Sequence, residues 1–151
     1  MYDAMNESFS ENVIDIEKYL RKIDYIIRLK GREILKDFNI TGPQFIALQK
    51  LINKENMTIG GLSREMSLAC STVTDLVDRM EKNKLVTRIK DSNDKRVVRI
   101  RVNKNGHRLV EEVLKRRILY VNEKLKDFEE KDKEFLKKNL ESLYEAMKMG
   151  K

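Results

Sequence analysis

The stretch STVTDLVDRMEKNKLVTRIKDSNDKRVVRIRVNKNG, residues 71–106, decides the fold. It begins with apolar residues at helical spacing and continues with two short alternating runs, typical of β-strands, on either side of a turn-like DSND. Residues 88–101 hold six basic side chains against two acidic ones. A hairpin needs a polar turn, but it does not need this much positive charge. The hairpin is therefore either a solvated surface or a surface that binds something anionic.

The residues before this stretch predict three short helices in succession. Thr41 and Gln44 match a capping box, and Pro43 falls in the first helical turn, where its missing N–H does no harm. Thr58 is a suitable cap for the next helix, TIGGLSREM. A third helix, over residues 70–82, follows the linker SLA. Two short helices joined by a tight turn and followed by a charged hairpin are the parts of a winged helix-turn-helix.

A helical wheel of residues 70–82 separates an apolar face from a polar one. Val73 lies at the centre of the inward face, and Cys70 lies on its flank, which predicts a small buried residue. The polar face carries Ser71, Asp75, Asp78 and Arg79, with Thr72 and Thr74 at its edges. The short hydroxyls and the carboxylate in its N-terminal half can reach base edges in a major groove. Residues 70–84 hold three acids and three bases, so phosphate affinity is expected from the hairpin instead.

The strand pattern of the hairpin groups Leu85, Thr87 and Ile89 on one face and Val86, Arg88 and Lys90 on the other. Two strands alone make no stable sheet, so the hairpin is expected to lean on neighbouring helices.

Longer helical patterns flank this centre. Residues 13–34 and 136–147 repeat apolar side chains in steps of three and four, with one step of seven. A central unit of about 65 residues, 39–103, could hardly cover both seams, which favours pairing between two chains. The predicted dimer interface contains Val13, Ile16, Leu20, Leu136, Leu140, Leu143 and Met147.

These patterns predict a mainly α (α+β) fold, a winged helix-turn-helix with a two-stranded β wing. The chain is interpreted as a single domain, 1–151, in which residues 1–38 and 104–151 form the dimerisation helices. Residues 39–103 form the DNA-binding lobe.

The chain resembles the MarR family of bacterial transcriptional regulators over roughly residues 11–148. The resemblance is strongest in TGPQFIALQKL, in STVTDLVDRMEKNKLV and in the wing DSNDKRVVRIRVNKNG. It implies a homodimer of winged-helix subunits that binds pseudo-palindromic DNA. It also implies that a small ligand or an oxidant weakens this binding.

Three residues depart from the family pattern. Lys84 stands where the family usually has a helix-ending glycine, so Asn83 or Lys84 must supply a left-handed cap. Asn103 replaces the usual threonine and keeps a capping side chain. Asp75 occupies a position that is often basic or neutral; it could accept from a cytosine amine, or repel phosphate in a wrong register.

These observations predict a repressor that reads its operator with helix 70–83 in the major groove and the 90–98 wing in the minor groove. Arg96 is expected to enter the minor groove with Asp94 orienting it, while Lys95 binds phosphate. The DNA-binding set is Thr58, Ser71, Thr72, Thr74, Asp75, Arg79, Arg88, Lys90, Asp94, Lys95, Arg96 and Arg99. The alternative is a winged-helix protein adaptor. A single-strand binder is disfavoured because residues 53–106 contain no aromatic ring.

The composition bounds the other possibilities. The 151 residues carry a formal net charge of +7, although residues 1–17 hold five acids and no base. One cysteine rules out an internal disulfide, and with no signal segment or apolar membrane span it predicts a cytoplasmic protein. One histidine and no phosphate-binding glycine loop argue against a metal centre, a resident cofactor or an enzyme. Cys70 as a redox sensor is the weaker alternative to a structural cysteine. The expected partners are double-stranded DNA, a second copy of the chain and an effector.

Overall fold

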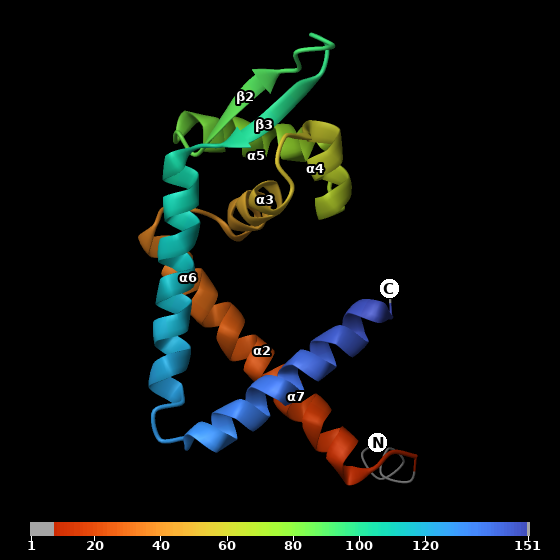
Figure 1. Ribbon diagram of the computed structural model, residues 1–151, viewed down its shortest axis with the longest axis vertical. Helices are drawn as coiled ribbons and strands as arrows, with labels where there is room; N and C mark the ends of the chain where they lie inside the picture. The colour runs from red at the N-terminus through yellow and green to blue at the C-terminus, as the bar shows by residue number, and fades with distance from the viewer. Residues whose placement is uncertain (1–7, 151) are drawn as a thin grey trace. The chain divides into compact units, whose positions relative to one another are not determined.

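The computed structural model describes residues 8–150, so Asp3 and Glu7 of the acidic N-terminal segment lie outside the described residues. Figure 1 shows the elements in chain order. They are α2 (Glu11–Asp37), α3 (Gly42–Asn53), β1 (Met57–Thr58), α4 (Ile59–Met66), α5 (Cys70–Lys82), β2 (Val86–Lys90), β3 (Val98–Val102), α6 (Lys104–Lys124) and α7 (Glu130–Met149). The chain divides into two compact units at Leu114, within α6. The predicted class, mainly helical with a small antiparallel sheet, is confirmed.

The predicted helix starts are confirmed in detail. At the start of α3, the Thr41 hydroxyl accepts the Gln44 N–H at 3.3 Å, and the Gln44 side chain accepts the Thr41 N–H at 3.1 Å. Both bonds of the capping box are therefore present. At the start of α4, the Thr58 hydroxyl accepts the Gly61 N–H at 3.0 Å.

The predicted two-stranded wing is present as the antiparallel hairpin of β2 and β3, and a third strand, β1, which the sequence pattern did not predict, extends the sheet. Their order is β1-β3-β2, and all neighbours are antiparallel. The two residues of β1 pair with β3 as Met57↔Ile100 and Thr58↔Arg99. Strand β1 joins the hairpin to the segment before α4, so the central strand β3 has a hydrogen-bonded neighbour on each side.

The two faces of β2 follow the predicted grouping, and the buried one carries an arginine. Val86 pairs with Val102 and Arg88 with Ile100, and directly paired residues lie on the same face of a sheet. Val86 and Ile100 are both 1% exposed. Arg88 therefore lies on the core-facing side of the wing, while Thr87 lies on the other side.

The same backbone pattern ends α2, α4 and α5: a left-handed residue followed by an apolar residue whose N–H bonds back into the helix. The left-handed residues are Asn39, Ser67 and Lys84, with φ of 52°, 54° and 61°. In α5 the Lys84 N–H bonds to the Glu81 carbonyl at 3.0 Å, and the Leu85 N–H bonds to the Met80 carbonyl at 2.9 Å. Of the two residues proposed for the left-handed cap, the chain uses Lys84.

The junction between the wing and α6 is close-packed. A Cβ added at Gly106 would lie 2.5 Å from the Leu85 carbonyl oxygen and 2.6 Å from Val102 Cγ1. Asn103, just before α6, connects the same parts: its amide group donates to the Lys84 carbonyl at 3.3 Å and accepts from the Thr87 hydroxyl at 2.8 Å. The carboxamide that the sequence predicted to cap the helix bonds to β2 and to the turn that follows α5.

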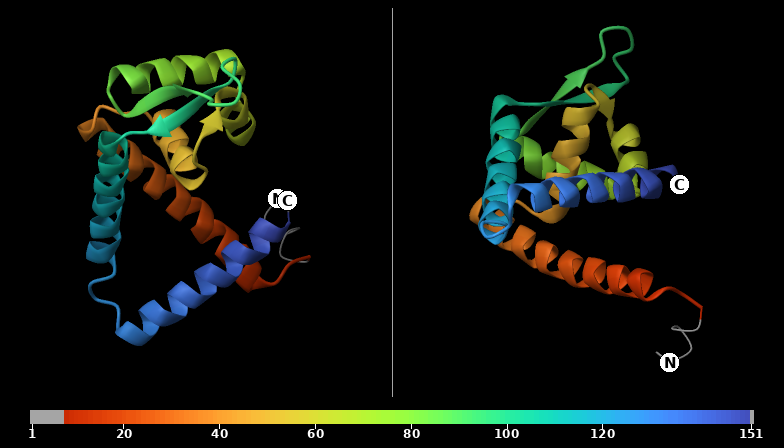
Figure 2. Two further views of the ribbon diagram at one scale, coloured as in Figure 1. Left: turned by 45° about the horizontal axis from the view of Figure 1, so that its top comes forward. Right: turned by 60° about the horizontal axis from the view of Figure 1, so that its bottom comes forward.

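The core lies between α3, α4, α5 and the sheet. Leu48, Leu62, Val73, Val77 and Met80 are completely buried there. They come from three helices and pack in one cluster with Ile100 and Val113. This cluster fixes α5 beneath the sheet, as Figures 1 and 2 show.

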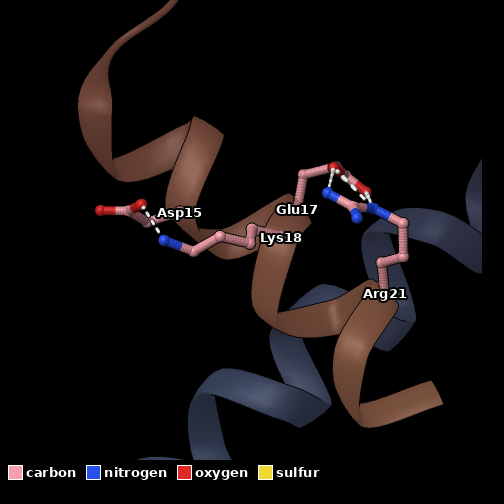
Figure 3. Close-up of polar contacts among 4 residues, drawn as sticks. All are labelled: Asp15, Glu17, Lys18 and Arg21. Atoms are coloured by element: carbon pink, nitrogen blue, oxygen red, sulfur yellow. Dashed lines mark hydrogen bonds and ion pairs between the residues drawn. The ribbon is translucent and has the colours of Figure 1, made fainter. Parts of the chain in front are cut away.

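The two long terminal helices are much more exposed. On α2, Val13 and Ile16 are 54% and 53% exposed, and none of the residues of α7 is buried. Charged side chains of α2 pair along the helix: Lys18 with Asp15 at 3.0 Å, and Arg21 with Glu17 at 3.0 Å (Figure 3). Surface pairs of this kind contribute little to stability. None of the helices described over residues 8–150 has the length and apolarity to cross a membrane.

Candidate nucleic-acid interface

The exposed face of α5 carries the side chains predicted to read bases. Ser71, Thr72, Asp75 and Arg79 are all exposed, while Val73 and Val77 on the opposite face are completely buried. Thr74 is half-buried, and its hydroxyl donates to the Cys70 carbonyl at 2.8 Å. Four of the five predicted α5 residues are thus presented to solvent, and the fifth bonds to its own helix.

The turn before α5 is built around a buried serine. The Ser63 hydroxyl, on α4, donates to the Leu68 carbonyl at 2.7 Å, and Cys70 Sγ lies 3.5 Å from the same hydroxyl oxygen. The prediction that Cys70 is buried is wrong, because the residue is exposed. It occupies the first turn of α5, where the core no longer covers the flank of the helix.

The loop between β2 and β3 is organised by Asp91. One oxygen of its carboxylate accepts the Asn93 and Asp94 N–H groups at 3.2 and 3.0 Å, and the other accepts Arg99 Nε at 2.9 Å. The hydrogen bond from Arg99, followed by the bonds from the backbone, lowers the pKa of the Asp91 carboxyl. Sequence reasoning missed this role, although the signal was present: an aspartate two and three residues before the groups it binds is typical of an Asx turn.

At the tip of the loop, Asp94 binds Arg96. The Asp94 carboxylate accepts Arg96 Nε at 3.1 Å and Nη2 at 3.2 Å, while the Arg96 side chain is 91% exposed. These hydrogen bonds lower the pKa of the Asp94 carboxyl. Lys95 and Lys90 are also exposed. The loop projects away from the helices of its lobe (Figures 1 and 2), so the basic side chains are presented together.

Arg88 points the other way, toward α5. Its Nη1 donates to Glu81 Oε1 at 2.8 Å, its Nη2 donates to Asp78, and its backbone N–H donates to Glu81 Oε2 at 3.0 Å. The side chain is only 27% exposed. The backbone and side-chain bonds from Arg88 hold the pKa of the Glu81 carboxyl below its usual range. Arg88 thus connects strand to helix.

Two further residues of the predicted DNA-binding set have structural partners. Arg99 donates to Asp91 and, through Nη1, to the Asn56 carbonyl at 2.9 Å, so it connects β3 to the loop before β1. Thr58 belongs to β1 and caps α4. The predicted set therefore separates into two groups. One consists of residues on α5 and the wing segment that are open to solvent, and the other of Arg88, Arg99, Thr58 and Thr74, whose side chains bond within the lobe.

A cavity of about 220 Å³ lies beside the C-terminal half of β3. Its lining is Leu51, Ile52, Glu55, Asn56, Ile100, Arg101, Val102 and His107. Among residues 8–150, no group of three or more His, Cys, Asp and Glu side chains is placed to hold a metal ion.

Comparison with known proteins decides what this lobe is. The sequence model of the MarR family matches residues 40–98, which span α3 to the first residue of β3. The HTH-type transcriptional regulator YsmB of Bacillus subtilis is 49% identical over 138 residues, 91% of this chain and 94% of that protein. The structure of a MarR family protein from Bacillus stearothermophilus superposes with a TM-score of 0.84 at 42% identity, covering 93% and 98% of the two chains. The chain belongs to the MarR family.

Other MarR-like proteins share parts of this likeness. The organic hydroperoxide resistance transcriptional regulator of Bacillus subtilis is 30% identical over 69% of this chain and 76% of its own length. The Staphylococcus aureus MepR–DNA complex has the same fold, with a TM-score of 0.68 at 23% identity over 87% and 98% of the chains. The protein is thus a MarR family transcriptional regulator with a DNA-binding winged helix.

Proposed function

We propose that the protein is a homodimeric repressor that binds a pseudo-palindromic operator, with α5 in the major groove and residues 90–98 in the adjacent minor groove. One observation carries this proposal: the exposed face of α5 is polar and nearly neutral, while the loop beside it is basic and projects from the same lobe. Phosphate and minor-groove contacts would come from the loop, and base contacts from the helix.

The exposed side chains of α5 determine which bases the helix can recognise. Ser71 and Thr72 offer hydroxyls that donate or accept, Asp75 can accept from a cytosine amine, and Arg79 can donate to guanine. The N-cap residue Ala69 has no polar side chain, so the first N–H groups of α5 are available to a phosphate oxygen.

The homodimer is supported by the terminal helices. The exposed side chains on α2 and α7 repeat at the spacing of a packed seam, and a second copy would bury both seams by symmetry. Two lobes related by a two-fold axis would then read two half-sites of a palindrome.

Release of DNA by a small ligand is the regulation we propose. The cavity beside β3 supports it, since a ligand there would touch both the central strand of the wing and the start of α6. Arg101 and His107 on an apolar floor of Leu51 and Ile52 suit a small anion with an apolar body. Sensing through Cys70 is the weaker option. Peroxide that releases DNA from the parent but not from Cys70→Ala would favour the thiol over the cavity.

The test is selection of DNA fragments from the protein's own genome, followed by binding to a selected duplex over a range of salt concentrations. We expect a shared palindromic sequence and an affinity that falls steeply with salt, because contacts to phosphates release counterions. The absence of salt-sensitive retention on duplex DNA would instead indicate a protein adaptor.

A further inference from the structure

Arg88 joins strand β2 of the wing to helix α5 through three hydrogen bonds. Its guanidinium binds Asp78 and Glu81, which lie three residues apart on α5, and its backbone N–H binds Glu81. Over residues 8–150, no other side chain forms a hydrogen bond between β2 and α5, so these three residues, here called the wing clamp, are the polar connection between the two elements.

The chemistry of the clamp suits positioning. A guanidinium is planar and presents its donors in a fixed fork, so it holds two carboxylates in a defined geometry with little further loss of freedom. Its partial burial reduces competition from water. Within the clamp, Arg88 lies in the middle of β2, the strand that leads into the loop carrying Arg96.

We propose that Arg88, Asp78 and Glu81 are positioning residues, which fix the direction of the wing relative to α5 and so determine whether helix and wing can bind one DNA site together. This inference rests on the proposed function. It differs from the sequence-based expectation that Arg88 binds DNA itself, because its donors are directed at the helix.

Electrostatics alone makes the opposite prediction, which allows a sharp test. Replacing both acids, Asp78→Asn with Glu81→Gln, removes two negative charges from a lobe that binds a polyanion. If only charge mattered, DNA affinity would rise. If the clamp positions the wing, affinity should fall by tenfold or more. The matched control, Glu111→Gln with Glu112→Gln, removes two charges from exposed positions on α6 and should leave affinity unchanged or slightly higher.

A double-mutant cycle separates positioning from general stability. In the parent, Arg96→Ala is expected to weaken binding by tenfold or more. In an Arg88→Gln background the same change should cost less than about threefold, because a displaced wing no longer brings Arg96 to its groove. Arg101→Gln, on the other face of the wing, is the control background, in which the full effect of Arg96→Ala should persist.

If one of the other clamp variants fails to fold, Arg88→Lys can still test the proposal. Lysine keeps the charge and the stem but lacks the fork, so affinity should fall to an intermediate value with thermal unfolding close to that of the parent. Tighter or unchanged binding by the Asp78→Asn, Glu81→Gln variant, or additive effects of Arg88→Gln and Arg96→Ala, would overturn the clamp alone. A parent that binds no duplex DNA would overturn the proposed function, and the clamp with it.

Discussion

The central lobe and the terminal helices use similar apolar side chains with opposite results. In the lobe, Leu48, Val77 and Met80 are completely buried within one chain. On the terminal helices, Ile16 is 53% and Leu140 is 51% exposed, although both belong to regular apolar seams. Burial of an apolar side chain stabilises a protein by about 1.5–3 kcal/mol. The buried side chains of the lobe therefore stabilise its fold, and the exposed side chains of the seams make little such contribution. The apolar side chains of the lobe are buried within one chain, and those of the seams are the ones that the proposed dimer would bury.

The strongest test of this contrast is a charge in the α7 seam. Leu140→Glu should weaken dimerisation by about 3–6 kcal/mol, because a two-fold axis places the change in both chains. Sedimentation at micromolar concentration measures it. Ser142→Glu adds the same charge on another side of the helix and should leave the dimer intact. A parent that sediments as a monomer at these concentrations would contradict the contrast itself.

A substitution that creates a cavity in the core of the lobe should destabilise the single chain and not the dimer contact. Leu48→Ala should lower the free energy of unfolding by about 2–5 kcal/mol, and this loss should be independent of protein concentration within a range where the dimer persists. Denaturant unfolding at two concentrations checks both points. Ile46→Ala on the same helix, at a position 47% exposed, should cost much less. Equal losses from the two variants would show that α3 is not packed as described.

The wing should affect binding without affecting the fold. Arg96→Ala should weaken DNA binding by on the order of 1–3 kcal/mol per half-site and reduce the preference for A·T-rich flanks. Lys95→Ala should lower affinity uniformly and reduce the salt slope by roughly one unit per site. Ser92→Ala in the same loop is the control. Unchanged affinity in Arg96→Ala, with an unchanged melting temperature, would make the loop a solvated surface.

The end of α5 offers a gain in stability. Lys84→Gly should stabilise the protein by about 1 kcal/mol, because a side chain in the left-handed region is strained and glycine is not. Asn39→Gly should give less, since asparagine tolerates this region well. Lys82→Gly, inside the helix, should destabilise by about 0.5–1 kcal/mol. Thermal unfolding ranks the three, and a loss in Lys84→Gly would refute the account.

The smallest effect concerns pH. Because its bonds lower the pKa of the Asp91 carboxyl in the folded protein, the ionised form favours folding above the ordinary pKa of about 4. This contribution is lost as the pH falls through the folded value. The melting temperature of the parent should exceed that of Asp91→Asn at pH 7, and the difference should shrink toward pH 3. A difference that grows on acidification would reverse the assigned sign.

Most of the secondary structure could be read from the sequence because caps and periodicity are local. The helix predicted over residues 70–82 matches α5 at both ends, and the capping box at Thr41 marks the start of α3. The strand β1 could not be found, because two residues are too short to show alternation and form a strand only through pairing with β3.

The sequence predicted which residues belong to the candidate site better than it predicted where their side chains point. A run of basic residues carries no information on where each side chain points, so Arg88 was grouped with Arg96. Register sets the difference: Arg88 lies opposite buried Ile100 and finds two carboxylates, while Arg96 lies on a loop. The exposure of Cys70 was missed for a related reason, since a helical wheel gives direction but not how far the core extends along the helix.

Gly106 shows how a stabilising rule of thumb would mislead an engineer of this protein. Glycine is among the poorest helix formers, so exchanging it for alanine inside α6 is the kind of change that consensus or propensity-guided design selects first. Here the added methyl group would meet a backbone carbonyl that has little freedom to move away. The residue that weakens the helix in isolation is the one that lets helix and strand meet. Designs derived from helix propensity alone should therefore leave this position fixed.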